Sequence, residues 1–587
     1  MKQFTPKSTM YYDNFKALLM ESAALYGSQT AITTYDRQGR AREKTYTDVR
    51  DDAFAFARAL YAHGLAGKHI AIVGENSYQW LITYFGIAVS GGTAVCIDIE
   101  HSDDIVLEMI RQADAVAVVA SEALADLCAP LLAQEDGIQS LIVIGRPYGA
   151  GISLEDFLGE QVRGGTATGE QAAAQPADAA GLRGMFAEAT GLREPDAASA
   201  EAALWLQDFT PEGTSVASIV YTSGTTSTAK PVMLSHRAIL YNAADSLTLL
   251  DSRERVFNSL PLYHTYGLTC GVLCAFIRGL NICISCDMKR LMQEMTLFKP
   301  GMLVAVPLII EIIHKLYWSV FEKQDKKSRI QKMIKLEGAV RKPGSLIGAD
   351  VREAVAGTPM EQLDVILSGG AYLSAAVAGE LYHFGVTVLQ GYGITECAPS
   401  ISCNRNEDFS PDSVGAILPG YEVRFEDDEI LVKGYSLMNG YYGAPELTRE
   451  SFTEDGWFRT GDLGYMDKRG HLHITGRKKN LIVMKNGKKV AAEEMENELM
   501  QMPLVKEVLV YGALSGNSAD DVKIAAAVYP DPLKTENMSS YEILEKLQAY
   551  VDELNKKLPL YKQVQMVNIQ EKGFEHTSAH KIKRNLI

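Results

Sequence analysis

A loop of hydroxyl side chains that ends in a lysine is the part of this sequence best suited to chemistry. The β-branched run at 219–222 is typical of a buried strand, and it breaks directly into this loop. Hydroxyl donors, backbone N–H groups and one mobile ammonium in so small a space predict a phosphate site, and an ordinary polar surface loop is the alternative. Ala229 stands where a Walker A loop needs glycine, which excludes that motif. The candidate phosphate ligands are Thr222, Ser223, Gly224, Thr225, Thr226 and Lys230.

Four further motifs follow this loop along the chain. They are Gly391-Tyr392-Gly393-Ile394-Thr395-Glu396, Thr460-Gly461-Asp462, Gly476-Arg477-Lys478-Lys479 and, close to the carboxyl end, Lys581. The first fails the Rossmann dinucleotide fingerprint because Glu396 replaces its third glycine. Each motif alone is more often a turn at a strand end. Together and in this order, the motifs resemble those of the AMP-forming acyl-CoA synthetases of the adenylate-forming enzyme superfamily.

The resemblance implies how ATP would be held. The loop that ends in Lys230 would bind the β- and γ-phosphates, Tyr392 would lie against adenine, and Thr395 would contact the α-phosphate. Glu396 would help to hold Mg²⁺, an ion that is commonly coordinated by one or two carboxylates and by substrate phosphates. The carboxylate of Asp462 would accept hydrogen bonds from the ribose hydroxyls.

The same resemblance assigns the remaining site residues. Arg477 would be the second ribose contact, and the segment Gly369-Gly370-Ala371 would line adenine and the acyl channel, with glycines that let ligands approach the backbone. His264 would lie near the reacting carboxyl group, although a lone histidine among aromatic residues is as often structural. Lys581 would reach the substrate carboxylate and the α-phosphate during adenylation.

Two positions are implied for the second half of the reaction. Lys479 matches the hinge about which the C-terminal domain of these enzymes swings, and Gly487 matches the glycine beside which the pantetheine arm of coenzyme A passes. Residues 75–80 and 392–399 look most like the medium- to long-chain fatty acid–CoA ligases. The expected reaction is therefore ATP-dependent conversion of a fatty acid to acyl-AMP with pyrophosphate release, followed by transfer to coenzyme A.

Departures from the family pattern leave alternatives open. Ser227 and Pro231 stand where glycines are common, and His580 replaces a usual glycine. One alternative is an acyl-AMP ligase that loads a separate acyl carrier protein. The other is a nucleotide-binding homologue with low turnover, against which the retained Glu396 and Lys581 argue.

Composition limits the partners. The 57 basic and 73 acidic residues give a net charge of −16, which argues against wholesale binding of nucleic acid or anionic membranes, although peripheral membrane contact stays open. The chain shows no signal peptide and no apolar run of transmembrane length, so a cytoplasmic enzyme is expected. Cys283 and Cys286 form a CxxC, but on a strand they would face opposite sides, so buried small residues are favoured over a zinc site.

The order of local patterns predicts an α/β fold in two domains. Strand and helix patterns alternate over the first 145 residues and again after 215, which is typical of layered α/β sheets. Short alternating runs at 410–475 predict a small antiparallel β subdomain. We expect an N-terminal adenylation domain at 1–478, with a flexible insertion at 148–204, and a small mobile α+β domain at 479–587.

Overall fold

A computed structural model describes most of the chain. Its described residues are 8–133, 137–147, 149, 151–159, 197–222, 229–251, 253–285, 287–340, 347–484, 488–514, 522–575 and 582–584. Most of the predicted insertion lies outside these ranges, as do six predicted site residues. Those residues are Ser223, Gly224, Thr225, Thr226, Gly487 and Lys581.

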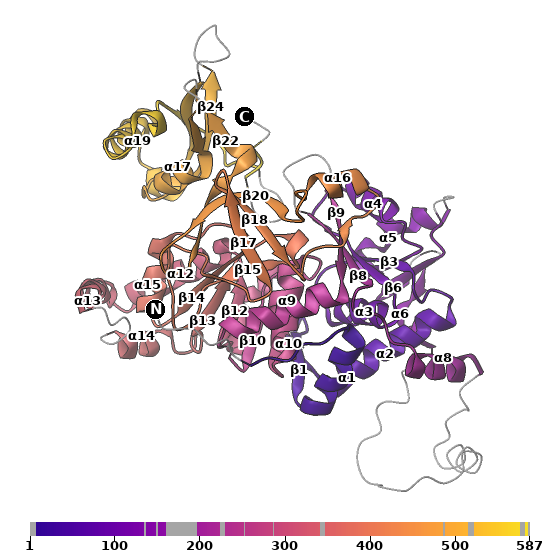
Figure 1. Ribbon diagram of the computed structural model, residues 1–587. Coiled ribbons are helices and arrows are strands. Elements are labelled where there is room, and N and C mark those ends of the chain that lie inside the picture. The colour runs from indigo at the N-terminus through magenta and orange to yellow at the C-terminus, as the bar shows by residue number, and fades with distance from the viewer. Residues whose placement is uncertain are drawn as a thin grey trace.

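Two large sheets form the N-terminal part of the molecule (Figure 1). The first runs in the order β16 (Ala416–Ile417), β15 (Ser400–Cys403), β14 (Thr387–Gly393), β13 (Val365–Ser368), β12 (Met302–Ala305), β10 (Arg255–Asn258), β11 (Asn281–Ile284), β1 (Thr30–Tyr35) and β2 (Ala41–Thr45). The second runs β19 (Gly440–Tyr441), β9 (Pro231–Ser235), β8 (Val216–Tyr221), β4 (Thr93–Cys96), β3 (His69–Val73), β5 (Ala117–Ser121), β6 (Ser140–Ile144) and β7 (Ile152–Ser153).

The central strands of both sheets are parallel, and helices cover their faces. Strand β4 is buried along its whole length, as expected for a parallel strand with helices on both sides. The N-terminal helices are α1 (Phe15–Tyr26), α2 (Tyr46–Ala62), α3 (Tyr78–Val89), α4 (Asp103–Gln112), α5 (Ala125–Cys128), α6 (Leu154–Leu158), α8 (Ala197–Asp208), α9 (His236–Leu249), α10 (Cys274–Ile277), α11 (Leu291–Phe298), α12 (Pro307–Lys323), α13 (Lys327–Val340), α14 (Gly348–Val355), α15 (Ala375–His383) and α16 (Pro445–Glu450).

Local sequence explains where several helices begin. Thr45 and Asp48 form a reciprocal capping box at the start of α2, and Ser77 accepts a hydrogen bond from the backbone N–H of Trp80 at the start of α3. The apolar faces of these helices join one extensive core. Its largest fully buried side chains include Phe15, Tyr46, Trp80, Tyr84, Phe85 and Phe276.

A four-stranded antiparallel sheet follows, as the alternating runs at 410–475 predict. Its order is β17 (Tyr421–Glu426), β18 (Glu429–Gly434), β20 (Phe458–Met466) and β21 (Leu472–Arg477). It lies between the first large sheet and the C-terminal part of the chain (Figure 1).

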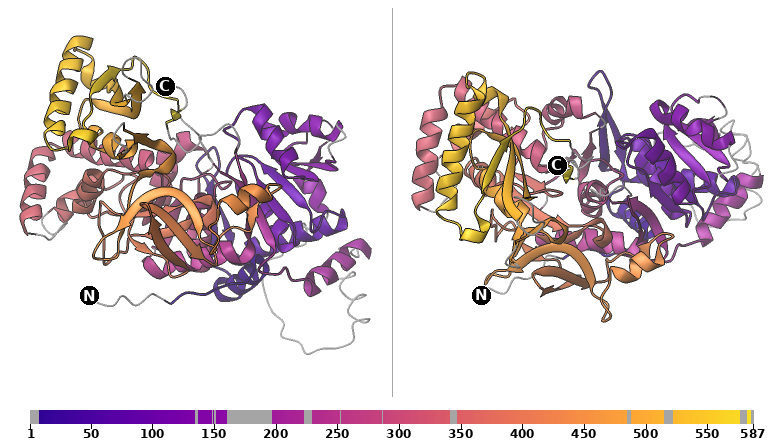
Figure 2. Two further views of the ribbon diagram at one scale, coloured as in Figure 1. Left: turned by 45° about the horizontal axis from the view of Figure 1, so that its top comes forward. Right: turned by 90° about the horizontal axis from the view of Figure 1, so that it is seen from above.

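The C-terminal part is a small α+β unit with its own hydrophobic core. It contains the pair β22 (Leu481–Val483) and β23 (Lys489–Ala491), the sheet β24 (Val505–Leu514), β25 (Val522–Pro530) and β26 (Met566–Ile569), and the helices α17 (Ala492–Leu499), α18 (Pro532–Thr535) and α19 (Ser540–Asn555). In the left view of Figure 2 this yellow unit lies above the orange strands and pink helices. The predicted fold class is confirmed, and the boundary at 478–479 stays a prediction.

No described helix is long and apolar enough to cross a lipid bilayer.

Candidate active site

A cavity of about 850 Å³ opens where the large sheets, the antiparallel sheet and the linker to the C-terminal unit meet. Twelve of the predicted site residues line it. They are Thr222, Lys230, His264, Gly369, Gly370, Gly391, Tyr392, Gly393, Thr395, Glu396, Arg477 and Lys479. Ala371 is exposed and is not among the lining residues.

Two strand ends deliver most of these residues. Strand β13 ends at Ser368 and β14 ends at Gly393, so both release their loops at the carboxyl edge of the parallel sheet, where α/β folds bind ligands. Gly393 is required there, because a Cβ atom would overlap the carbonyl group of Pro399. Gly370 has a φ of +83°, a conformation that favours glycine.

Gly369 lies next to the aromatic ring of Tyr266. A Cβ atom at this position would lie 2.9 Å from Cζ of Tyr266. The missing side chain therefore admits a protein ring as well as any ligand.

The predicted ribose ligand Asp462 lies behind the cavity wall and is 3% exposed. The Tyr392 hydroxyl donates to its Oδ2 at 2.7 Å, and Arg477 Nε lies 2.9 Å from its Oδ1. Strands β20 and β21 pair Asp462 directly with Arg477. The Asp462 carboxylate raises the pKa of the Arg477 guanidinium. The pKa of the Tyr392 phenol is also raised, mainly by burial and to a smaller extent by the Asp462 carboxylate. One hydrogen bond and one ion pair thus join residues of three strands at the predicted adenosine site.

Glu396 is held by a residue that the sequence motifs missed. The Tyr441 hydroxyl donates to Oε1 of Glu396 at 2.8 Å, and Lys230 Nζ lies 5.0 Å from the centroid of the Tyr441 ring. Tyr441 is on strand β19, which pairs with β9 immediately after Lys230. The pairing of these strands, rather than any local pattern, brings Tyr441 to the site.

The side chain of Glu396 fits a Mg²⁺ ligand. One oxygen accepts from Tyr441, and the residue lines the cavity. Within the described part of the chain, no cluster of three or more His, Cys, Asp and Glu side chains is arranged to hold a metal. A cation at Glu396 would therefore complete its shell with phosphate oxygens and water, as Mg²⁺ commonly does.

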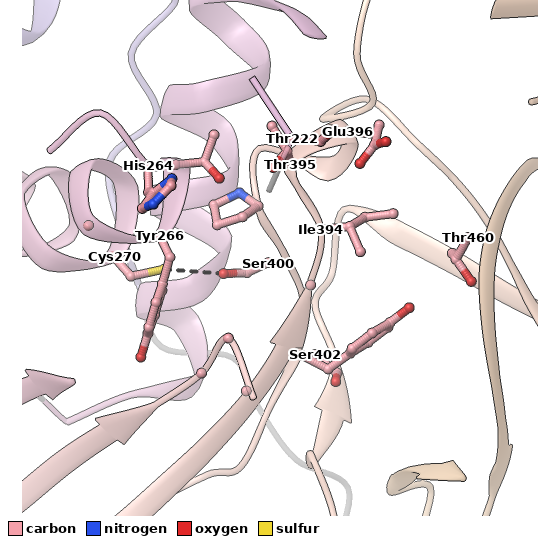
Figure 3. A pocket seen from close by; sticks show the side chains of 18 of the residues that line it. Thr222, His264, Tyr266, Cys270, Ile394, Thr395, Glu396, Ser400, Ser402 and Thr460 are labelled. Carbon is pink, nitrogen blue, oxygen red and sulfur yellow. Dashed lines mark hydrogen bonds between the residues drawn. The ribbon is translucent and has the colours of Figure 1, made fainter. Parts of the chain in front are cut away.

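His264 lies on the opposite side of the cavity from Glu396 (Figure 3). Its Nε2 atom is 3.8 Å from Oδ2 of Asp98, and Nε2 of His101 is 3.7 Å from the same oxygen. Asp98 follows strand β4 and is 4% exposed. The sequence carried no signal for this carboxylate, because it lies far from every motif.

The His264 side of the cavity continues into a wall of thiols and apolar side chains. Cys270 Sγ lies 3.3 Å from the Ser400 hydroxyl oxygen (Figure 3). Burial raises the pKa of the Cys403 thiol to about 12. Further members of this wall are Cys274, Val306, Ile309 and Leu389. The predicted burial of Cys283 is borne out by its position on β11, whereas Cys286 is outside the described residues.

The predicted hinge residue Lys479 lies in a single turn, Lys478–Asn480, between β21 and β22. Burial and the neighbouring Arg477 lower its pKa. From the C-terminal unit, Glu493 accepts hydrogen bonds from the Arg477 backbone N–H at 3.4 Å and from the Asn480 side chain at 2.5 Å. Contacts of one carboxylate therefore span the predicted hinge.

The family follows from the comparison with known proteins. Residues 19–442 match the family model described as AMP-binding enzyme, and residues 479–587 match the AMP-binding enzyme C-terminal domain. The chain belongs to the AMP-binding enzyme family. The predicted membership of the adenylate-forming enzymes, and of their AMP-forming acid–CoA ligase group, is confirmed.

Relatives of this AMP-binding enzyme include named CoA ligases. It is 28% identical to the long-chain-fatty-acid–CoA ligase FadD15 of Mycobacterium bovis over 85% of this chain and 80% of that protein. It is 31% identical to the long-chain-fatty-acid–CoA ligase of Escherichia coli over 62% of this chain and 64% of that protein. The crystal structure of the anthranilate CoA ligase AuaEII with anthranoyl-AMP shares the fold, with a TM-score of 0.73 and 20% identity over 98% of this chain and 96% of that chain.

Proposed function

We propose that this AMP-binding enzyme activates a medium- or long-chain fatty acid with ATP and then transfers the acyl group to coenzyme A. The observation that carries the proposal is the division of one cavity into two chemistries. Its polar side holds Asp462, Tyr392 and Arg477 in one group and Glu396 near Lys230 in another. Its other side carries the apolar side chains of Val306, Ile309 and Leu389. A nucleotide suits the first side and an acyl chain the second.

In the first step, a carboxylate oxygen of the acid attacks the α-phosphorus of ATP, and the bond to the β-phosphate oxygen breaks to release pyrophosphate. Asp462 and Arg477 would hold the ribose, and Tyr392 would lie against adenine. Lys230 and Lys581 would balance the charge that develops on the phosphates. Glu396 would hold Mg²⁺, which neutralises phosphate charge when bound.

In the second step, the coenzyme A sulfur attacks the acyl carbon, and AMP departs with the bonding electron pair. His264, which lines the cavity, would contact the reacting carboxyl group, and the pantetheine arm of coenzyme A would pass beside Gly487. Rotation of the C-terminal unit about Lys479 would withdraw Lys581 from the cavity and open the channel for the thiol of coenzyme A.

An assay of both half-reactions with a series of carboxylic acids tests the proposal. The full-length enzyme, ATP, Mg²⁺ and coenzyme A should release pyrophosphate and form a thioester in equal amounts with fatty acids. Formation of pyrophosphate and acyl-AMP without thioester would indicate that the acceptor is an acyl carrier protein instead of coenzyme A. No pyrophosphate with any acid would overturn the enzymatic assignment.

A further inference from the structure

Lys230 and Glu396 carry opposite charges and line the same cavity, yet they do not pair. Throughout the described ranges, no ion pair joins Lys230 to a carboxylate, and none joins Glu396 to a cation. Opposite charges in a partly enclosed cavity attract strongly because the surrounding protein screens them less than water does. Something in the structure must therefore keep them apart.

The Tyr441 side chain contacts both of them. Its hydroxyl donates to Glu396 Oε1 at 2.8 Å, and its ring lies under the Lys230 ammonium at 5.0 Å. The first contact is a charge-assisted hydrogen bond and the second is a cation–π contact.

The backbone fixes this side chain in place. The Tyr441 N–H donates to Thr448 Oγ1 at 2.9 Å, and strand β19 pairs Tyr441 with Val232 of β9. The Met438 N–H donates to the carbonyl oxygen of Glu396 at 2.8 Å. Tyr441 is 3% exposed. The ring is therefore held firmly enough to act as a spacer.

We propose that Tyr441 is a positioning residue that separates Lys230 from Glu396, and so keeps the ammonium available to a phosphate and the carboxylate available to a hydrated divalent cation. This inference rests on the proposed function, because it assumes that MgATP occupies the cavity. Without the ring, Lys230 would pair with Glu396, and each would lose its ligand.

Calorimetric binding of MgATP, and of AMP without Mg²⁺, to the full-length protein tests the proposal. Tyr441→Phe keeps the ring and removes the hydroxyl, so MgATP binding should weaken about tenfold, the scale of one lost charge-assisted bond, while AMP binding stays unchanged. Tyr442→Phe is the matched control. The Tyr442 hydroxyl donates to Asp114 outside the cavity, so this variant should bind both nucleotides as the unaltered protein does.

A double-variant cycle tests the spacer itself. In the unaltered protein, Lys230→Met should weaken MgATP binding about tenfold or more, the scale of a lost charged contact. In the Tyr441→Leu background the same substitution should cost little or restore binding, because it releases Glu396 from the new ion pair. Tyr441→Met replaces Tyr441→Leu if the latter does not fold, as judged by its thermal unfolding.

The possible results distinguish failure of the spacer from failure of the proposed function. Equal effects of Lys230→Met in both backgrounds, or MgATP binding unchanged by Tyr441→Phe, would overturn the spacer while the proposed function stands. Failure of the unaltered protein to bind MgATP would overturn both.

Discussion

At the scale of single residues, charge placement distinguishes the two sides of the cavity. Asp462 engages both carboxylate oxygens, one with Tyr392 and one with Arg477, so its orientation is set before any ligand arrives. In its proposed role as ribose ligand, an acceptor oriented in advance would need little reorganisation. The wall around Cys270 includes the apolar side chains of Val306, Ile309 and Leu389, which suit an uncharged acyl chain.

Lys581 provides the first prediction at this scale. Its ammonium is proposed to balance charge between the carboxylate and the α-phosphate only during adenylation. Lys581→Ala should slow acyl-AMP formation about 10²- to 10³-fold, the scale of one lost electrostatic contact. Thioester formation from supplied acyl-AMP should survive. Normal adenylation, measured by pyrophosphate release, would exclude the role, and Lys583→Ala is the control because it removes a nearby tail charge.

His236 provides the second prediction at the scale of single residues. Burial lowers the pKa of this imidazole to about 4, below an ordinary value of 6.5, and its Nδ1 accepts from the Phe15 N–H at 3.5 Å. A group whose folded pKa is lowered in this way stabilises the fold in its neutral form. The stabilisation is complete above pH 6.5 and is lost as pH falls toward 4.

Denaturant unfolding at neutral pH and at about pH 5 measures this loss. The unaltered protein should lose about 2 kcal/mol more than His236→Gln between these conditions, since the variant has no imidazole to protonate. Equal pH dependence of the two proteins would show that another group controls acid stability.

At the scale of elements, the turn at Lys478–Asn480 decides how the two parts of the chain move. Glu493 of α17 contacts groups on both sides of that turn, so a rotation about it must break the bond to the Arg477 N–H. Lys478 also pairs with Glu429 of β18 at 2.8 Å. These contacts stabilise the arrangement seen in Figure 2.

Lys479→Pro tests the turn as a hinge. Proline fixes φ near −65° and restricts the residue before it, so the swing should be hindered. Acyl-AMP formation should stay largely intact while transfer to coenzyme A is suppressed, and Lys479→Ala should affect transfer much less. Equal loss of both half-reactions, or loss of neither, would place the hinge elsewhere.

At the scale of the whole molecule, a net charge of −16 coexists with a cavity that is lined by both basic and acidic side chains, the acids being Glu100, Glu396, Glu429 and Glu450. Lys230, Arg477, Lys478 and Lys479 all line it. A local basic group in an acidic protein attracts a compact polyanion such as ATP without recruiting extended polyanions.

The acyl side of the cavity predicts the preferred acids. Each buried methylene contributes about 0.8 kcal/mol, so a two-carbon extension gains roughly tenfold until the cavity is full. We expect kcat/KM to rise steeply from acetate to octanoate or beyond and then to level off. A preference for acetate, or for benzoate over every fatty acid, would refute the fatty-acid assignment and leave adenylation standing.

Gly369→Ala sharpens this test. The added Cβ would lie 2.9 Å from Tyr266 Cζ, so the ring must shift, and activity on the longest acids should fall most. Gly370 is unsuitable for the purpose, because its φ of +83° would strain any other side chain.

The order of motifs and the α/β rhythm could be predicted from the sequence, because both are local. The sequence predicts strands β4 and β13 as short apolar runs, and Glu396 and Asp462 stand in recognisable motifs. The resemblance to adenylate-forming enzymes followed from five ordered motifs, these two among them, and the family match confirms it.

Only the tertiary structure decided which residues complete the site. Tyr441 is 45 positions from Glu396 in sequence, and Asp98 lies far from His264, so no local pattern joins either pair. Pairing of β19 with β9 brings the first together, and the end of β4 at the cavity brings the second. Periodicity reports which face of an element is buried, whereas long-range contacts depend on how the sheets pack. For that reason the sequence determined the family of this protein, and the fold decided which side chains meet in its cavity.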